Sequence, residues 1–451
     1  MKKIRIGSGA GYAGDRIEPA VELMEKGNLD YIIFECLAER TIAIGQMDKL
    51  KNPKKGYNQL LEYRMEKILP ILKKNNIKVI TNMGSANPVE AANVTAKLAH
   101  EANLSDIKIA CVTGDDILSD IADYYNNNIL ELDPCSLGEI KDKIVSANVY
   151  MGCEGIVEAL ENGADIVITG RVSDPALTIG PLCYEFGWNP DENIYEMGQA
   201  TLAGHLLECG GQATGGYYAD PGYKDVPGLE RLGFPIVEIG EDGEFFVTKV
   251  PEAGGLVTED TLKEQTIYEI HDPKAYMTPD VIADFSHVKF EEIAKDMVKA
   301  SNATSHGRPE TYKVSIGYRD CYIGEGEISY GGSNAMARAR LAADIIEKRL
   351  KIVGFEYDEL KIEYIGFNSL YGNKISAGFA PDRFSEIRLR VAARTRDKKD
   401  ADHIGNEVEA LYTSGPAGGG GATKKTSDIV SICSIFVPRS AVDIKVNYLE
   451  V

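Results

Sequence analysis

The chain alternates short apolar runs with longer segments in which apolar residues recur every three or four positions. Runs rich in Ile and Val are typical of buried strands, and the period of 3.6 residues between them is typical of helices. The runs lie at residues 4–6, 30–34, 77–81, 107–112, 148–151 and 164–169. This alternation predicts an α/β fold with a mostly parallel, doubly wound (Rossmann-like) sheet that helices cover on both faces.

The pattern changes in the second half of the chain. Residues 233–250 predict a β-hairpin, and beyond residue 285 the strands alternate apolar and polar positions. Two successive β-α-β passes then favour a smaller α+β domain of the ferredoxin-like type. We therefore predict an α/β core domain over residues 1–285, which carries the functional site, and a ferredoxin-like domain over residues 286–451.

Composition narrows the classes of function. The 451 residues carry 49 Lys and Arg against 69 Asp and Glu, a formal net charge of -20. This acidity disfavours nucleic acids and anionic membranes as partners, although a local basic pocket could still hold a small anionic metabolite. No run approaches the roughly 18 apolar residues of a membrane span, and no signal peptide precedes the first strand. The eight cysteines are scattered without a pairing pattern, which predicts reduced thiols in the cytoplasm.

The first strand leads into a glycine-rich loop with the spacing of a dinucleotide-binding turn. Gly9, Gly11 and Gly14 have this spacing, and Glu35 stands near the position of a ribose-binding acid. Such turns also serve other anions, or let a helix pack close to its strand. Asp15 directly follows the last glycine and would repel a pyrophosphate. We expect Gly11 and Asp15 to contact a ligand, with a nucleotide as the lesser alternative.

Polar side chains follow several of the predicted strands. Glu35 and Glu39 would share one face if this segment is helical, and either a solvated helix start or an acid–base pair would explain them. Asn82 and Gly84 follow the third strand, where an amide either binds a ligand or forms a turn. Asp115 follows the fourth. Because parallel strands end at one edge of a sheet, we expect these groups to face a common crevice.

The densest group of such residues lies between residues 152 and 216. A buried strand there ends in Gly-Arg-x-x-Asp-Pro, so that Arg171 would pair a substrate carboxylate and Asp174 would exchange protons. His205 and Glu208 are three residues apart and therefore lie on one face of a predicted helix. This spacing suits a pair of metal ligands, an acid–base pair or a structural hydrogen bond between the two side chains. Because the sequence offers no obvious third metal ligand, we favour the acid–base pair and the structural hydrogen bond. Gln212 and Thr214 follow in a glycine-rich loop open to a ligand.

Two further segments could contact a ligand. Lys249 precedes a Gly-Gly loop and could hold a carboxylate or phosphate, or simply lie on the surface. The glycine-rich stretch at residues 414–425 lacks the spacing of a phosphate-binding loop. A mobile loop is the favoured interpretation, as a lid or a subunit contact.

Several motifs in one order resemble the acyclic terpene utilisation AtuA-type family over nearly the whole chain. They are GAGYAGDR (9–16), LAERT (37–41), ITGRVSDPAL (168–177), GHLLEC (204–209), QATGG (212–216), EQ (264–265), YEI (268–270), DP (272–273) and PDV (279–281). The resemblance implies a catabolic enzyme, or an accessory protein, for branched acids or their coenzyme A esters. It indicates no particular cofactor.

Three functions follow from these observations. The first is an enzyme that acts by proton transfer on an anionic branched or multi-carboxylate acid or its CoA ester, as a hydratase, dehydratase or carbon–carbon lyase. Its catalytic candidates are Glu39, Asp174, His205 and Glu208. Its substrate-binding candidates are Gly11, Asp15, Asn82, Gly84, Arg171, Gln212, Thr214 and Lys249. The second is an NAD(P)-binding oxidoreductase, and the third is a non-catalytic subunit that recruits a small partner protein. We also expect a homo-oligomer.

Overall fold

The computed structural model describes residues 2–132, 134–378 and 384–451. The chain divides into two compact units, one formed by Met1–Gly317 with Ile432–Val451 and the other by Tyr318–Ser431. Residue 285, where we place the domain boundary from sequence, lies within the first unit.

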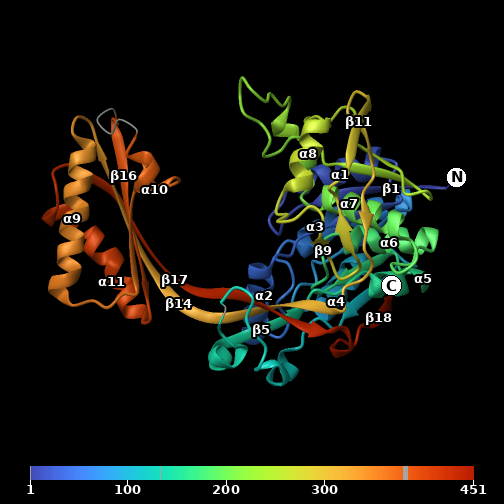
Figure 1. Ribbon diagram of the computed structural model, residues 1–451, viewed down its shortest axis with the longest axis horizontal. Helices are drawn as coiled ribbons and strands as arrows, with labels where there is room; N and C mark the ends of the chain where they lie inside the picture. The colour runs from blue at the N-terminus through green and yellow to red at the C-terminus, as the bar shows by residue number, and fades with distance from the viewer. Residues whose placement is uncertain (1, 133, 379–383) are drawn as a thin grey trace. The chain divides into compact units, whose positions relative to one another are not determined.

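The first unit is built on a ten-stranded mixed sheet, which confirms the α/β class (Figure 1). Its centre is parallel, with the strand order β1-β2-β3-β6-β4. These strands are β1 (Lys3–Ala10), β2 (Tyr31–Phe34), β3 (Lys78–Thr81), β6 (Ile166–Thr169) and β4 (Lys108–Thr113). All four residues of β2 are buried, as expected for a strand covered on both faces.

Antiparallel strands extend this centre on both sides. Beside β1 lie the hairpin β7 (Ile236–Gly240) and β8 (Phe245–Thr248), then β12 (Met297–Ser301) and β11 (Lys289–Ala294). Beside β4 lies β18 (Lys445–Glu450) from the C-terminal segment. The predicted hairpin is confirmed. The strand predicted at residues 148–151 is instead β5 (Ile144–Val149), which pairs with β14 (Thr311–Gly331) outside the central sheet.

Helices form two groups packed on the parallel strands. One consists of α1 (Glu18–Lys26), α3 (Leu61–Asn75) and α4 (Pro88–Glu101), whose apolar faces join the main core. The other consists of α5 (Glu154–Glu161), α6 (Ala176–Phe186) and α7 (Ile194–Glu208). Helix α7 is buried along most of its length, so even its polar residues lie inside the protein.

Shorter elements complete the first unit. Helices α2 (Glu39–Lys51) and α8 (Glu259–Ile267) flank the ends of β2 and α7, and a small sheet consists of β9 (Tyr276–Met277), β10 (Ile282–Asp284) and β13 (Thr304–Ser305). Short 3₁₀ segments are η1 (Leu118–Tyr124), η2 (Leu137–Lys143), η3 (Gly210–Thr214), η4 (Leu229–Arg231) and η6 (Arg439–Ala441). Within the described ranges, no helix is both long and apolar enough to cross a membrane.

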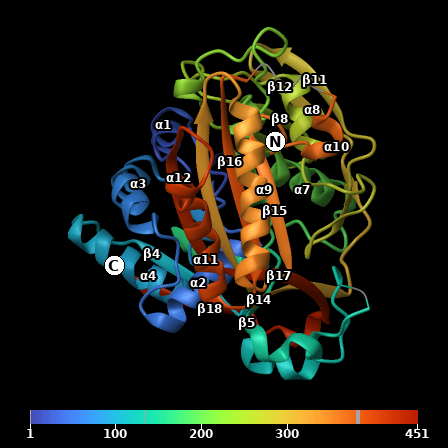
Figure 2. The same cartoon turned by 90° about the vertical axis from the view of Figure 1, so that its left-hand side faces the viewer.

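The second unit has a four-stranded sheet in the order β15-β16-β14-β17, with α9 and α11 side by side against it (Figure 2). Its elements are α9 (Ala335–Val353), β15 (Glu359–Ile365), α10 (Gly372–Ser376), β16 (Glu386–Thr395), α11 (Lys398–Glu409), α12 (Leu411–Ser414) and β17 (Gly419–Pro438). Alternate residues of β16 join α9 and α11 in a second core. The glycine-rich stretch is not a loop throughout, since residues from Gly419 onward form the start of β17.

Candidate active site

A cavity of about 1070 Å³ lies within the first unit, where β1, β2 and β6 end. The segments that follow these strands contribute Gly11 and Asp15, Glu35 and Glu39, and Ser173 and Asp174. The rest of the wall comes from several other segments: Tyr150, the end of α7 with η3, residues 229–234, residues 268–279 before, in and after β9, residues 309–313 at the start of β14, and Phe436. Of the residues expected from sequence to face one crevice, Glu35 and Glu39 line the cavity, whereas Asn82 and Gly84 after β3 and Asp115 after β4 do not.

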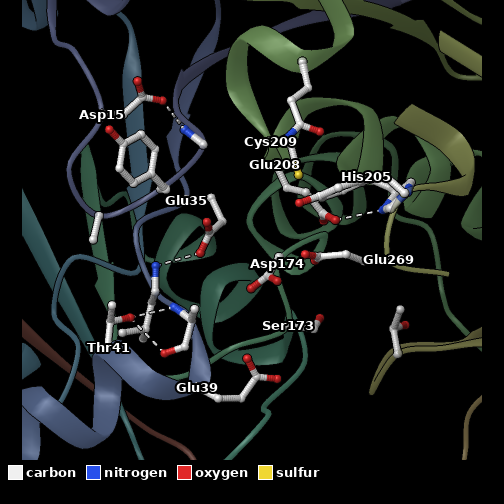
Figure 3. A pocket seen from close by; sticks show the side chains of 18 of the residues that line it. Asp15, Glu35, Glu39, Thr41, Ser173, Asp174, His205, Glu208, Cys209 and Glu269 are labelled. Atoms are coloured by element: carbon white, nitrogen blue, oxygen red, sulfur yellow. Dashed lines mark hydrogen bonds and ion pairs between the residues drawn. The ribbon is translucent and has the colours of Figure 1, made fainter. Parts of the chain in front are cut away.

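The wall of this cavity is strongly acidic. Figure 3 shows Asp174 with Glu269, Glu35, Glu39 and Glu208 around it. Three cationic or potentially cationic side chains also line it, namely Arg16, His205 and Lys313. Among the described residues, no group of three or more His, Cys, Asp and Glu is arranged to hold a metal ion.

His205 and Glu208 form a buried pair at the end of α7. Nδ1 of His205 lies 2.8 Å from Oε1 of Glu208, and Nε2 lies 2.9 Å from the carbonyl oxygen of Gln265. A carbonyl oxygen can only accept, so Nε2 carries a hydrogen and donates it. The contact between Nδ1 and Oε1 then requires a second proton, held by either partner. The two residues therefore share one exchangeable proton.

The pKa values of this pair agree with that geometry. Burial raises the pKa of Glu208, the charge and hydrogen bond of His205 oppose this, and Asp174 and Glu269 add to the rise, so that the pKa is about 7. Burial alone would lower the pKa of His205, but the charge of Glu208 and the hydrogen bonds to Glu208 and to the backbone together outweigh it and raise that pKa above its ordinary value. Oε2 of Glu208 is buried and has no hydrogen-bond partner within the described part of the chain. It is the atom of the pair left available to a substrate.

Glu35 is a second carboxyl group held in a fixed position. Its Oε1 accepts hydrogen bonds from the backbone N–H of Leu37 at 2.7 Å and from Nδ2 of Asn82 at 3.0 Å. Burial raises its pKa well above the ordinary value, and Asp174 adds to this effect although Arg171 opposes it. Because Oε1 already accepts two hydrogen bonds, a retained proton lies on Oε2. Asn82 itself is fully buried and does not line the cavity.

Arg171 lies behind the wall rather than on it. Its side chain is 1% exposed and is not among the cavity-lining residues. Its guanidinium donates to Asp174 and to the carbonyl oxygen of Leu37, and it stacks on the ring of Tyr150 at 4.1 Å. Asp115, also buried, accepts the backbone N–H of Arg171 at 3.0 Å. In this geometry Arg171 positions Asp174 and the segment that leads to Glu39.

Glu39 and Asp174 have opposite pKa shifts. Burial acts to raise the pKa of Glu39, but the hydroxyl of Tyr150 and the charge of Arg171 lower it below the ordinary value. Lys313 Nζ lies 3.5 Å from the Glu39 carboxylate. Burial raises the pKa of Asp174 despite the opposing charge of Arg171. Glu35 and Glu39 do not share a helix face, because α2 begins only at Glu39.

Several amides of the glycine-rich loop after β1 are already hydrogen-bonded within the loop. The Asp15 carboxylate accepts the backbone N–H groups of Gly11 at 2.9 Å and Arg16 at 2.8 Å. These are groups that a pyrophosphate would need, and α1 begins only at Glu18. Gly11 lies against the end of α7, since a Cβ on it would stand 2.3 Å from the backbone carbon of Cys209. The loop therefore fixes the end of α7, where Glu208 lies.

The remaining candidates divide between the cavity and the interior. Gln212 lines the cavity, whereas Gly84, Thr214 and Lys249 do not. Thr214 is fully buried and donates to the carbonyl oxygens of Gly211 and Gly233. Lys249 is buried as well, 3.4 Å from the Asp296 carboxylate. Thr214 and Lys249 therefore interact with other parts of the protein and do not line the cavity.

Sequence reasoning did not select four residues that line the cavity, namely Tyr150, Glu269, Tyr276 and Lys313. Glu269 has a left-handed backbone conformation with φ of 58°, which is uncommon for a residue other than glycine. Glu269 belongs to YEI, one of the motifs that carry the resemblance to the family, and this could have marked it as a candidate. No comparable signal marks Lys313, because it lies on the strand β14 far along the chain.

The fold and this cavity define an α/β protein with a buried His–Glu pair in an acidic site. The model of the acyclic terpene utilisation family protein AtuA matches residues 4–448, and the chain belongs to that family. Membership suggests a role in acyclic terpene catabolism. Neither the curated proteins nor the solved structures include a match to the chain.

Proposed function

We propose that this chain is an acid–base enzyme that adds water to, or removes it from, a branched acyl compound. The observation that carries the proposal is the single proton shared by His205 and Glu208 at the cavity wall. A general base works best when its pKa lies near the pH of the cell, and burial raises the pKa of Glu208 to about 7.

Each acid has a distinct role in this proposal. With the shared proton on His205, Glu208 is a carboxylate whose Oε2 accepts a proton from the carbon next to a carbonyl group. Glu35 keeps its proton on Oε2 and donates it to the departing hydroxyl group, so that water leaves. Addition of water follows the reverse path. Two carboxyl groups with unlike surroundings are a recurrent way to provide an acid and a base in one site.

The acidic wall favours an uncharged reacting group. Glu39 has a lowered pKa and is ionised at neutral pH, and its charge would repel a free carboxylate placed beside it. A thioester presents a neutral carbonyl group instead. We therefore propose that a branched acid enters as its thioester, such as a CoA ester, rather than as the free anion. Arg171 acts as a positioning residue for Asp174, because its guanidinium does not line the cavity.

The test uses short thioesters of branched 2-enoic and 3-hydroxy acids, with the free acids for comparison. Gain or loss of one water is followed by mass spectrometry. We expect turnover of thioesters and none of the free acids, and loss of turnover in Glu208→Gln. Equal rates for the wild type and Glu208→Gln would overturn the proposal, as would turnover of the free acids alone.

We also propose the finer fold assignments. Helices packed in two groups on the parallel strands support a Rossmann-like core in the first unit. The element order β14-α9-β15-β16-α11-β17 and the sheet order β15-β16-β14-β17 support a ferredoxin-like second unit.

A further inference from the structure

A second pair of carboxyl groups lies directly behind the cavity wall. Asp280 follows Thr278 and Pro279, which line the cavity, and Glu154 is the first residue of α5. A Cβ placed on Gly152 would stand 2.4 Å from Oε2 of Glu154 and 2.5 Å from Oδ1 of Asp280. Both oxygens thus approach the same point, so the two carboxyl groups are close neighbours.

Each of these groups has one satisfied and one unsatisfied oxygen. Oδ1 of Asp280 accepts the backbone N–H of Cys153 at 2.8 Å. Oε1 of Glu154 accepts from Arg308 at 3.1 Å and from Arg439 at 2.6 Å. Oδ2 of Asp280 and Oε2 of Glu154 are buried without a partner among the residues that the structure describes. Two buried acceptors without donors, on neighbouring carboxyl groups, are unfavourable unless one of the groups keeps a proton.

We propose that Glu154 and Asp280 share one proton between these two oxygens, and that the shared proton positions the adjoining wall of the cavity. The proton supplies the donor that neither carboxylate has alone. A hydrogen bond between a carboxylic acid and a carboxylate is among the stronger ones in proteins. This proposal does not depend on the proposed function.

The pair connects three segments of the wall. Asp280 anchors the turn after β9, and Glu154 reaches Arg308, which directly precedes the cavity-lining Pro309. Arg439 bridges the two sides, because it donates to Glu154 and also to the carbonyl oxygen of Pro279 at 2.7 Å. Loss of the proton would weaken the connection between the turn after β9 and the start of α5.

The surrounding groups set the pH range. Burial, followed by the charge of Glu154, raises the pKa of Asp280 to about 6. The other ionisable groups around the pair are Arg308, Arg439, Tyr312, Asp191, Cys153 and Cys183. The folded protein thus holds a proton that the unfolded chain loses near pH 4. The contribution of Asp280 to stability therefore falls as the pH rises from about 4 to about 6, and stays low above that range.

The experiment compares melting temperatures of the full chain between pH 5 and pH 8. Asp280→Asn keeps the oxygen that Cys153 needs and offers a permanent donor to Glu154. Its melting temperature should exceed that of the wild type by about 2 °C or more at pH 8, with a smaller difference at pH 5. Asp280→Ala should melt below the wild type at every pH. The control is Asp284→Asn, four residues away, since that carboxyl has a lowered pKa and is ionised throughout this range.

Parallel pH profiles of the wild type and Asp280→Asn would overturn the proposal. If Asp280→Asn does not fold, Glu154→Gln provides the same donor from the other side and should also flatten the profile. Failure of both variants to fold would count against the proposal too, because each amide should fit the geometry of the shared proton.

Discussion

Glu208 Oε1 lies 2.8 Å from Nδ1 of His205, while the opposite ring nitrogen donates to the carbonyl of Gln265. This second hydrogen bond fixes the orientation of the ring and its Nε2 hydrogen. All proton exchange of the histidine therefore passes through Glu208. The pair resembles an acid–base unit whose reactive atom is a carboxylate oxygen, not an imidazole nitrogen.

Glu208→Gln tests this assignment most directly. The amide can still hydrogen-bond to His205 but cannot accept a proton, so we expect turnover to fall by about 10²–10⁴-fold. The melting temperature should change little. Glu264→Gln is the control, because Glu264 is exposed on the neighbouring helix α8, where it pairs with Lys224. Similar losses of turnover in both variants would contradict a specific role for Glu208.

Glu35→Gln should abolish turnover without lowering the stability of the protein. Glutamine matches a protonated glutamic acid in shape and keeps the oxygen that accepts from Leu37 and Asn82. We expect the variant to be at least as stable as the wild type at pH 7, because the native site favours the neutral form. Turnover should be lost, since an amide donates no proton. Chemical unfolding and thioester turnover measure the two effects; a variant that stays active would exclude Glu35 as the acid.

The parallel core could be predicted from the sequence because each strand is a local pattern of apolar residues. The pairing of His205 with Glu208 could also be predicted from the sequence, because the two residues are three positions apart on one helix. Arg171 is different: its position behind the wall depends on Leu37, Tyr150 and Asp115, which come from three other segments. Sequence order does not reveal whether an arginine at a strand tip faces a ligand or the interior.

Lys249 and Thr214 illustrate the same limit. Their neighbours in sequence suggested open, glycine-rich loops, but the structure packs them against Asp296 and Gly233. The proton-sharing pair of Glu154 and Asp280 could not be foreseen either, because 126 residues separate the two positions in the chain. Long-range packing decides these contacts.

Arg171→Met should unfold more readily than the wild type. Removing the guanidinium leaves Asp174 without its cation and the carbonyl of Leu37 without its donor. Because Asp174 is partly exposed, the loss comes mainly from the buried carbonyl, and leaving such an acceptor without its donor typically costs about 1–3 kcal/mol of unfolding free energy. Urea titration measures the loss, and Arg16→Met, on an exposed arginine of the same cavity, is the control. Unchanged stability would show that Arg171 does not position this wall.

The wild type should lose stability as the pH rises from 5 to 8. Burial raises the pKa of Asp115 to about 6 and that of Glu208 to about 7, so the native protein holds protons that the unfolded chain has released. Stability then decreases with pH, by roughly 1 kcal/mol for Asp115 between pH 5 and pH 6, where the rest of its contribution is lost, and further for Glu208 up to about pH 7. Urea titrations at several pH values provide the measurement. Asp115→Asn should reduce the slope, and a stability that rises toward pH 8 would contradict the assignment.

Gly11→Ala should lower turnover by displacing Glu208, although Gly11 lies in the loop after β1 and not in α7. A Cβ at this position would stand 2.3 Å from the backbone carbon of Cys209, closer than any real contact, so the loop or the end of α7 must move. Because Cys209 directly follows Glu208, that movement displaces the base from its position. A displacement of about 1 Å can lower turnover by about 10²-fold. Gly420→Ala is the matched control, since no atom lies within 4 Å of its Cβ position. We expect Gly11→Ala to lower both the melting temperature and thioester turnover, while Gly420→Ala retains wild-type turnover. Full activity in Gly11→Ala would show that contact between the loop and α7 is not needed to place Glu208.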